Sequence, residues 1–101
     1  MASRLELHKT LCDILGSRNV YYQPPASVNM KYPAIRYDLQ GYKKVYANAG
    51  AYRLLPSYKL TLIDTNPDSP YVARILALPY CQFDRSYPAD NLNHFIFTLF
   101  N

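Results

Sequence analysis

Leucine and isoleucine recur at helical spacing near the start of the chain. The apolar positions are Leu7, Leu11, Ile14 and Leu15. They fall on one face of a helix with 3.6 residues per turn. Ser3 and Glu6 have the spacing of a capping box, and Gly16 provides a stop signal. The pattern predicts an amphipathic helix over residues 4–15.

Two strands are predicted next. Residues 19–23 have strand character and end at the rigid pair Pro24-Pro25. A second strand begins at Tyr32-Pro33, because apolar and polar side chains then alternate with the two-residue period of a half-buried sheet. The alternating residues are Ile35, Arg36, Tyr37, Asp38, Leu39 and Gln40.

The segment 41–56, "GYKKVYANAGAYRLLP", contains strand-forming residues without clean alternation. It is predicted to form either a long hairpin arm or a mobile loop. Alternation resumes over residues 57–64, where both faces are largely apolar or amphipathic, and this pattern predicts a central strand.

The sequence "NPDSP" signals the start of a second helix. Asp68 or Ser69 can cap free backbone amides, and Pro70 suits the first helical position. Val72, Ile75 and Leu76 would form its core face, and Pro79 would end it.

A hairpin is predicted at the end of the chain. One strand lies near residues 81–85, a turn passes through 87–91, and a last strand covers about 93–100. In the last strand Phe95, Phe97 and Leu99 share one face, and His94, Ile96, Thr98 and Phe100 share the other. Because both faces are apolar, the strand should need cover on both sides.

The predicted order is therefore α, β, β, β, α, β, β, in a single α+β domain over residues 1–101. We expect a mainly antiparallel sheet of four or five strands with both helices on one face. Two short helices cannot cover both faces of such a sheet, so a neighbouring copy is expected to cover the other.

Composition favours protein contacts. The chain has eleven tyrosines. A tyrosine ring with its hydroxyl suits a surface that is exposed to water in the free subunit and buried when a partner binds. The net charge is +4, but the Lys and Arg residues are scattered, which is a weak signature of nucleic-acid binding. The start "MASRLELHKT" and the lack of a long apolar run predict neither export nor membrane insertion. Two cysteines fit reduced thiols in a protein made in a cytoplasm.

Catalytic and metal-binding chemistry is disfavoured. A zinc site could use His8, Cys12, Cys81 and His94, but the paired spacings typical of such sites do not occur. Asp84, Asp90 and His94 could form an acid–base group, but no nucleophile motif accompanies them. Turn formation by Asp90, and pairing of Asp84 with Arg85 or with a neighbouring subunit, are simpler interpretations. The three glycines stand alone and form no phosphate loop. We expect no enzyme activity, no cofactor and no metal.

The arm segment interleaves aromatic and basic residues. The set is Tyr42, Lys43, Lys44, Tyr46, Tyr52 and Arg53. Such a set could form a stacking platform for single-stranded nucleic acid. Docking of the arm on protein is the favoured interpretation, because Pro56 and the small residues at 47–51 interrupt the platform.

Three segments together resemble the small tail-terminator, or tail-completion, proteins of long-tailed bacteriophages, which are also labelled head–tail joining proteins. They read "YPAIRY" at 32–37, "YKLTLIDTNPDSP" at 58–70 and "LPYCQFDRSYPADNLNHFIFTLF" at 78–100, and they span about two thirds of the chain. The most specific part runs from Phe83 to His94.

The resemblance implies a virion protein that forms a ring, usually of six copies, on top of the tail tube. The ring would contact the tube protein and the head-side connector, and DNA would pass through its lumen without sequence-specific binding. Interface candidates are the six arm residues above together with Tyr37, Tyr58, Asp84, Arg85, Phe95 and Phe97, of which Tyr37, Tyr58, Phe95 and Phe97 could equally belong to the core. A head-side stopper or adaptor of the neck and a small nucleic-acid-binding module remain as alternatives.

Overall fold

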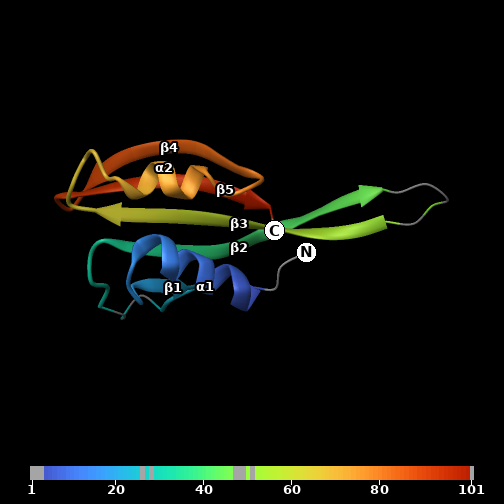
Figure 1. Ribbon diagram of the computed structural model, residues 1–101, viewed down its shortest axis with the longest axis horizontal. Coiled ribbons are helices and arrows are strands. Elements are labelled where there is room, and N and C mark those ends of the chain that lie inside the picture. The colour runs from blue at the N-terminus through green and yellow to red at the C-terminus, as the bar shows by residue number, and fades with distance from the viewer. Residues whose placement is uncertain (1–3, 26, 28, 47–49, 51, 101) are drawn as a thin grey trace.

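The chain folds into one curved five-stranded sheet with two helices (Figure 1). The computed structural model describes residues 4–25, 27, 29–46, 50 and 52–100. The elements are α1 (Arg4–Leu15), β1 (Val20–Tyr22), β2 (Ala34–Tyr46), β3 (Tyr52–Asp64), α2 (Tyr71–Leu76), β4 (Cys81–Ala89) and β5 (Leu92–Phe100). The predicted α+β class and pair of helices are confirmed, and the sheet has five strands where the sequence predicts four or five.

The sheet is mixed. Its strand order is β1-β2-β3-β5-β4, so that β1 and β4 form its two edges. β1 runs parallel to β2, and the other three neighbouring pairs are antiparallel. The parallel pairing joins Val20 to Ile35 and Tyr22 to Tyr37.

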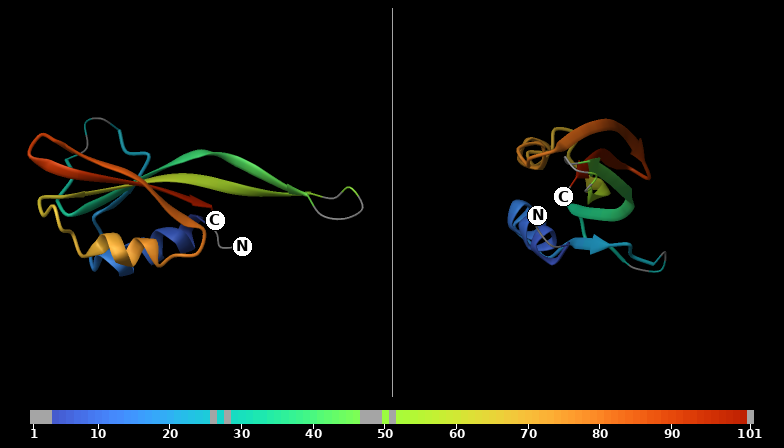
Figure 2. Two further views of the ribbon diagram at one scale, coloured as in Figure 1. Left: turned by 90° about the horizontal axis from the view of Figure 1, so that it is seen from above. Right: turned by 90° about the vertical axis from the view of Figure 1, so that its right-hand side faces the viewer.

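Both helices pack on the same face of the sheet (Figure 2). Helix α1 buries Leu7, Leu11 and Leu15 at the predicted helical spacing, and α2 buries Ile75. Ser3, the predicted cap of α1, lies outside the described residues. At the start of α2 the Ser69 hydroxyl accepts a hydrogen bond from the Tyr71 backbone N–H at 3.4 Å. The helix begins at Tyr71 with Pro70 as its N-cap, whereas the sequence predicts Pro70 as the first helical residue and Asp68 or Ser69 as the cap.

Tyr37 lies at the centre of the contact between α1 and the sheet. Its side chain is fully buried, and its ring centroid lies 4.8 Å from that of Tyr22 and 6.0 Å from that of Tyr58. Arg4 donates a hydrogen bond to the Tyr37 hydroxyl at 3.3 Å, and His8 Nδ1 lies 2.7 Å from the same oxygen. One tyrosine therefore joins β2 to the first two turns of α1.

The turn between β4 and β5 is shorter than the sequence predicts. The sequence prediction places Tyr87 and Pro88 in the turn, but both are paired residues of β4, opposite His94 and Asn93. Proline is tolerated there because β4 is an edge strand whose outer amides need no partner. Asp90 and Asn91 alone make the turn, with φ of 52° and 62°. Two positive φ values are typical of a type I′ turn, which matches the twist of an antiparallel hairpin.

This turn gives the first testable prediction. Asn91→Ala should lower the free energy of unfolding by about 1 kcal/mol, because alanine tolerates a positive φ less well than asparagine. Asn91→Gly should leave stability unchanged or raise it slightly, since glycine adopts this conformation freely. Urea unfolding at a fixed low protein concentration measures both variants. Equal losses in the two variants would mean that an Asn91 side-chain contact, not φ, is responsible.

The face opposite the helices is covered differently from the sequence prediction. A neighbouring copy was expected to cover this side of β5, yet Ile96 is 4% exposed and Ile63 of β3 is 6% exposed in the single chain. That expectation is wrong for these residues. The sheet is strongly curved, and β4 and the segment before β2 stand on either side of this face (Figure 2). The curvature of the sheet therefore buries Ile63 and Ile96, which a neighbouring copy was expected to bury.

Candidate functional site

The hairpin formed by the distal halves of β2 and β3 projects from the body of the molecule (Figure 1). We call the described residues 41–46 and 52–56 the arm. β1 pairs with β2 only at Ile35–Tyr37, and β5 pairs with β3 only from Ser57 onward. The arm is therefore a two-stranded ribbon with two free edges, an arrangement that is marginally stable on its own in water. It makes the molecule 52 Å long and 25 Å wide.

The sequence left open whether residues 41–56 form a hairpin arm or a loop, and the described residues form a paired hairpin. Tyr42 pairs with Pro56, Lys44 with Leu54, and Tyr46 with Tyr52. The tip residues 47–49 and 51 lie outside the described residues. A bulge between Leu39 and Gly41 separates the arm from the body of β2. Bulges bend a strand and increase its twist, so this one lies where the arm leaves the sheet.

One side of the arm is rich in tyrosine. Directly paired residues share a face, so this side carries Tyr42, Lys44, Tyr46, Tyr52 and Leu54, which we call the tyrosine face. Tyr42, Tyr46, Tyr52 and Leu54 are 61%, 73%, 55% and 45% exposed. The Tyr46 and Tyr52 ring centroids lie 6.4 Å apart, and Lys44 Nζ lies 5.0 Å from the Tyr52 centroid. Contiguous exposed apolar side chains of this kind indicate a surface that binds another molecule.

The arm also concentrates positive charge. Between residues 41 and 56 the sequence has three basic residues and no Asp or Glu, which gives +3 of the chain's net +4. The basic residues are Lys43, Lys44 and Arg53. The surface that receives the arm should therefore be neutral or acidic at its rim.

The six arm residues that were considered as a stacking platform, and for which docking on protein was favoured, do not share one surface. Tyr42, Lys44, Tyr46 and Tyr52 lie on the tyrosine face, but Lys43 and Arg53 point to the opposite side with Val45 and Leu55. Lys43 Nζ lies 5.6 Å from the ring centroid of Phe100 in β5. The arrangement is closer to an amphipathic docking ribbon than to an interleaved platform.

Strand β4 is the second exposed feature. It forms an edge of the sheet, and residues 82–88 are exposed. Phe83 and Tyr87 are 44% and 41% exposed. Asp84 sits at a register shift in β4 and accepts a hydrogen bond from the Thr98 hydroxyl at 2.6 Å, while Arg85 lies 5.7 Å from the centroid of the Tyr87 ring. The sequence predicts that Asp84 pairs with Arg85 or with a neighbouring subunit. In the structure the Arg85 guanidinium lies over Tyr87, and Thr98 bonds Asp84.

Four interface candidates lie in the core of the single chain. Tyr37 and Phe97 are fully buried, and Tyr58 and Phe95 are 5% and 9% exposed. For these residues the core interpretation is the one that burial supports, and their contribution to any assembly is to hold the subunit in shape. Sequence reasoning did not single out Leu54 and Phe83, which are exposed apolar residues on the arm and on β4. The register of the hairpins, which places them beside exposed tyrosines, would have indicated both.

The residues considered for metal binding are dispersed. Across the described ranges, no three His, Cys, Asp or Glu side chains gather closely enough to hold a metal ion. His8 contacts Tyr37, whereas His94 stacks on Tyr87 with ring centroids 4.9 Å apart and planes 3° from parallel. Cys12 and Cys81 both pack against the core. Within the same ranges, no helix is long and apolar enough to span a bilayer.

Comparison with known proteins gives no family assignment. No protein-family model matches the chain, and no curated protein matches it significantly. The function therefore has to be argued from the surfaces just described and from the sequence resemblance.

The environment of Cys81 gives a second prediction. Burial, with a smaller effect of the nearby Asp84 carboxylate, raises the pKa of the Cys81 thiol to about 11. The thiolate is the nucleophile, so Cys81 should react slowly with iodoacetamide at pH 8, and its rate should keep rising with pH up to about 11. Mass spectrometry of the alkylated Cys81 peptide measures the rate, with a free cysteine peptide as control. A rate that levels off below pH 9.5 would contradict the prediction.

Proposed function

We propose that this chain is a structural subunit of a bacteriophage tail, a tail terminator that closes into a ring on the tail tube. The observation that carries the proposal is the exposed arm. A two-stranded ribbon with +3 charge, whose tyrosine face exposes four apolar side chains, is poorly suited to bulk water and well suited to a partner subunit. The resemblance of the segment from Phe83 to His94 to tail terminators indicates the kind of assembly.

A ring needs a heterologous interface, in which two different surfaces of the subunit meet and rotation closes the contact. The arm supplies one surface. The free edge of β4 supplies a fitting partner, because it offers unpaired backbone groups and exposed Phe83 and Tyr87, with Asp84 close to its centre. In our proposal the arm of one copy lies against β4 of the next. This pairing also protects an edge strand that would otherwise invite aggregation.

The ring would be made in the host cytoplasm and incorporated into the virion at the neck, between the tail tube and the head-side connector. DNA would cross its lumen without being read. The exposed and partly basic arm supports contact with neighbouring proteins.

Two measurements test the proposal. Size-exclusion chromatography with light scattering of the purified chain should give a closed oligomer whose mass is a small integer multiple of 11.7 kDa. Image reconstruction of the particle that contains the chain should place it directly on the last ring of tube protein. A stable monomer both in solution and in the particle would overturn ring formation. A position in contact with the head connector but not with the tube would replace the terminator role with that of a stopper.

A further inference from the structure

The concave face of the sheet, opposite the helices, contains a hollow of about 330 Å³. Its floor comes from β2, β3 and β5, and its walls come from the segment before β2 on one side and from β4 on the other. The residues that matter here are Tyr32, Arg36, Lys59, Thr61, Tyr87 and His94. A volume of this size is at the lower end of the range of small-molecule sites, roughly 300–1,000 Å³. The hollow is separate from the tyrosine face of the arm.

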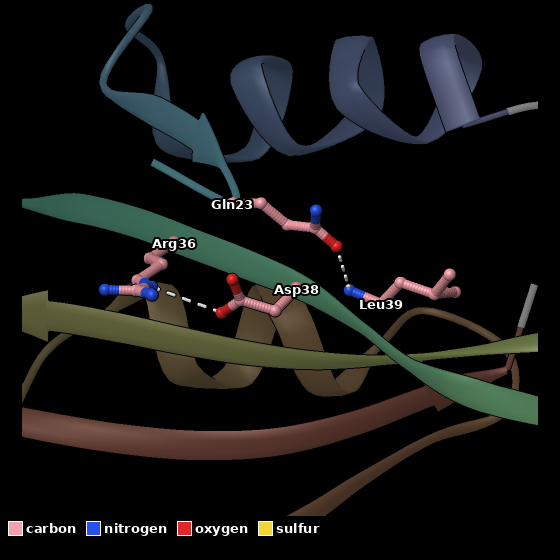
Figure 3. A network of polar contacts seen from close by, with 4 residues as sticks. All are labelled: Gln23, Arg36, Asp38 and Leu39. Carbon is pink, nitrogen blue, oxygen red and sulfur yellow. Dashed lines mark hydrogen bonds and ion pairs between the residues drawn. The ribbon is translucent and has the colours of Figure 1, made fainter. Parts of the chain in front are cut away.

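Two cations lie in this hollow. Arg36 of β2 and Lys59 of β3 both line it. Asp38 also lines it, paired across the strands with Lys59 and lying beside Arg36 with a nitrogen–oxygen distance of 3.2 Å (Figure 3). The ion pair holds the guanidinium against the sheet and occupies one of its nitrogens. The Arg36 side chain remains 42% exposed, and Lys59 has an exposed side chain. The three groups carry a formal net charge of +1, which favours an anion.

Further cations follow the same face of the sheet. Arg85 of β4 is paired with Ile96, which lies opposite Thr61 in the hollow. In the other direction Lys43 and Arg53 occupy the side of the arm that continues this face. Positive charge is therefore present beyond the hollow, on β4 and along the arm, although Asp84 lies on the same face through its hydrogen bond with Thr98. A ligand with more than one anionic group would suit this arrangement.

The two walls carry flat aromatic rings. Tyr32 and Tyr87 are 44% and 41% exposed. Tyr87 is stacked on His94, and this contact fixes the orientation of its ring. His94 Nδ1 is buried and has no hydrogen-bond partner in the described part of the chain. Buried polar atoms without a partner are rare and call for an explanation such as a bound molecule.

We propose that this hollow binds a nucleoside phosphate, either free or as one unit of a single-stranded polynucleotide. The phosphate lies against Arg36 and Lys59, and the base packs on Tyr32 or Tyr87. Base–aromatic stacking beside a row of cations is the usual way in which proteins hold single-stranded nucleic acid without reading its sequence. Two exposed rings on opposite walls favour a flat base over the carboxylate of an acidic peptide. The proposed phosphate contacts, Arg36 and Lys59, belong to neither surface of the proposed ring contact, whereas Tyr87 is shared with the β4 edge.

The test uses the full chain at low salt with four probes: AMP, inorganic phosphate, an eight-residue oligo-dT and hexaglutamate. Calorimetry or nitrogen-15 NMR titration measures the affinities. AMP, oligo-dT or both should bind more tightly than inorganic phosphate and hexaglutamate, with shifts at Arg36, Lys59 and Tyr87. Binding of AMP alone would identify a free nucleotide as the source, and preference for oligo-dT would identify a polynucleotide.

Matched variants separate this site from general charge attraction. Lys59→Gln should weaken binding about fivefold and, for oligo-dT, reduce the slope of log affinity against log salt by about one. Lys9→Gln removes the same charge from α1, on the other side of the sheet, and should change affinity less than twofold. Replacing both Tyr32 and Tyr87 with leucine should remove the preference of the site for AMP over phosphate, whereas Tyr80→Leu, outside the hollow, should retain it.

Three outcomes would overturn the proposal. They are no binding of AMP or oligo-dT at millimolar concentration, equal losses in Lys59→Gln and Lys9→Gln, and phosphate or hexaglutamate binding as tightly as the nucleotides. Backbone amide spectra of each variant confirm that it is folded. Oligomeric state is measured in parallel, so failure of this site and failure of ring formation are distinguishable.

Discussion

Replacing Tyr46 and Tyr52 with serine should convert the assembled protein into folded monomers. The two rings are 73% and 55% exposed and face the same side of the arm. If the arm docks on a neighbouring copy, these rings form the apolar centre of the contact, and truncating an aromatic residue at the centre of an interface costs about 2 kcal/mol or more. The double variant loses two such contributions at every interface of a ring, and this loss of binding free energy should be enough to dissociate it.

The body of the subunit should not change in this double variant, because neither ring contributes to the buried core. Light scattering measures the loss of the oligomer, and circular dichroism shows that the monomer keeps its sheet and helices. Leu5→Ser is the matched control, since Leu5 is an apolar residue of α1 at 70% exposure and is not part of the arm. An oligomer that survives the double change, or that is lost equally in Leu5→Ser, would show that the tyrosine face is not the contact.

The mating surface can be tested in the same way. Phe83→Ser on β4 should also release monomers, and mixing it with the Tyr46 and Tyr52 double variant should give dimers. Each variant has lost one of the two surfaces of a heterologous contact, so one intact arm and one intact β4 edge remain between them. Absence of dimers in the mixture, with monomers in each variant alone, would place the partner of the arm elsewhere on the subunit.

The elements that the sequence predicts best are those that bury one face against the rest of the same chain. Helix α1 has the predicted bounds, 4–15, because Leu7, Leu11 and Leu15 all pack on the sheet and produce a clear helical period. The segment 57–64 is recognisable for the same reason, since Leu60 and Leu62 are fully buried. Burial imposes periodicity, and periodicity is what a sequence shows.

The arm could not be assigned from the sequence because this rule does not apply to it. Both of its sides are exposed in the single chain, so no alternation between apolar and polar residues is required, and its aromatic, basic and aliphatic residues follow no regular period. The end of β4 was predicted too early for a related reason. Proline usually indicates a turn, but Pro88 can remain in β4 because an edge strand does not need a backbone N–H donor on its outer side.

The hollow on the concave face was invisible to sequence reasoning. Its residues come from the segment before β2 and from four strands, and they meet only because the sheet curves. No spacing in the sequence encodes that curvature. The prediction that a neighbour must cover this face failed for the same reason: it treated the sheet as flat.

Tyr37→Ala should remove most of the stability of the subunit. The Tyr37 ring is fully buried between α1 and β2 in contact with Tyr22 and Tyr58, and deleting a buried aromatic ring costs about 3–5 kcal/mol. A domain of this size has about 5–15 kcal/mol in total. Tyr37→Phe keeps the ring but removes the oxygen that contacts Arg4 and His8, and should cost about 1–2 kcal/mol. Tyr46→Phe, on the exposed arm, is the control for hydroxyl loss and should change stability very little.

Tyr37 and Tyr58 should make the folded protein less stable at alkaline pH. Burial raises the pKa of Tyr37 above the ordinary 10.0, because the charged phenolate is less well solvated in the core than in the unfolded chain. Below pH 10 the hydroxyl is neutral in both states and its contribution is complete; above pH 10 the unfolded chain ionises first, and stability falls with rising pH. Urea unfolding between pH 8 and 11 should show a smaller alkaline loss in Tyr37→Phe than in the native chain, and identical losses would mean that the Tyr37 hydroxyl reaches water. Tyr58 shifts in the same direction for the same cause, so part of the loss should remain in the variant.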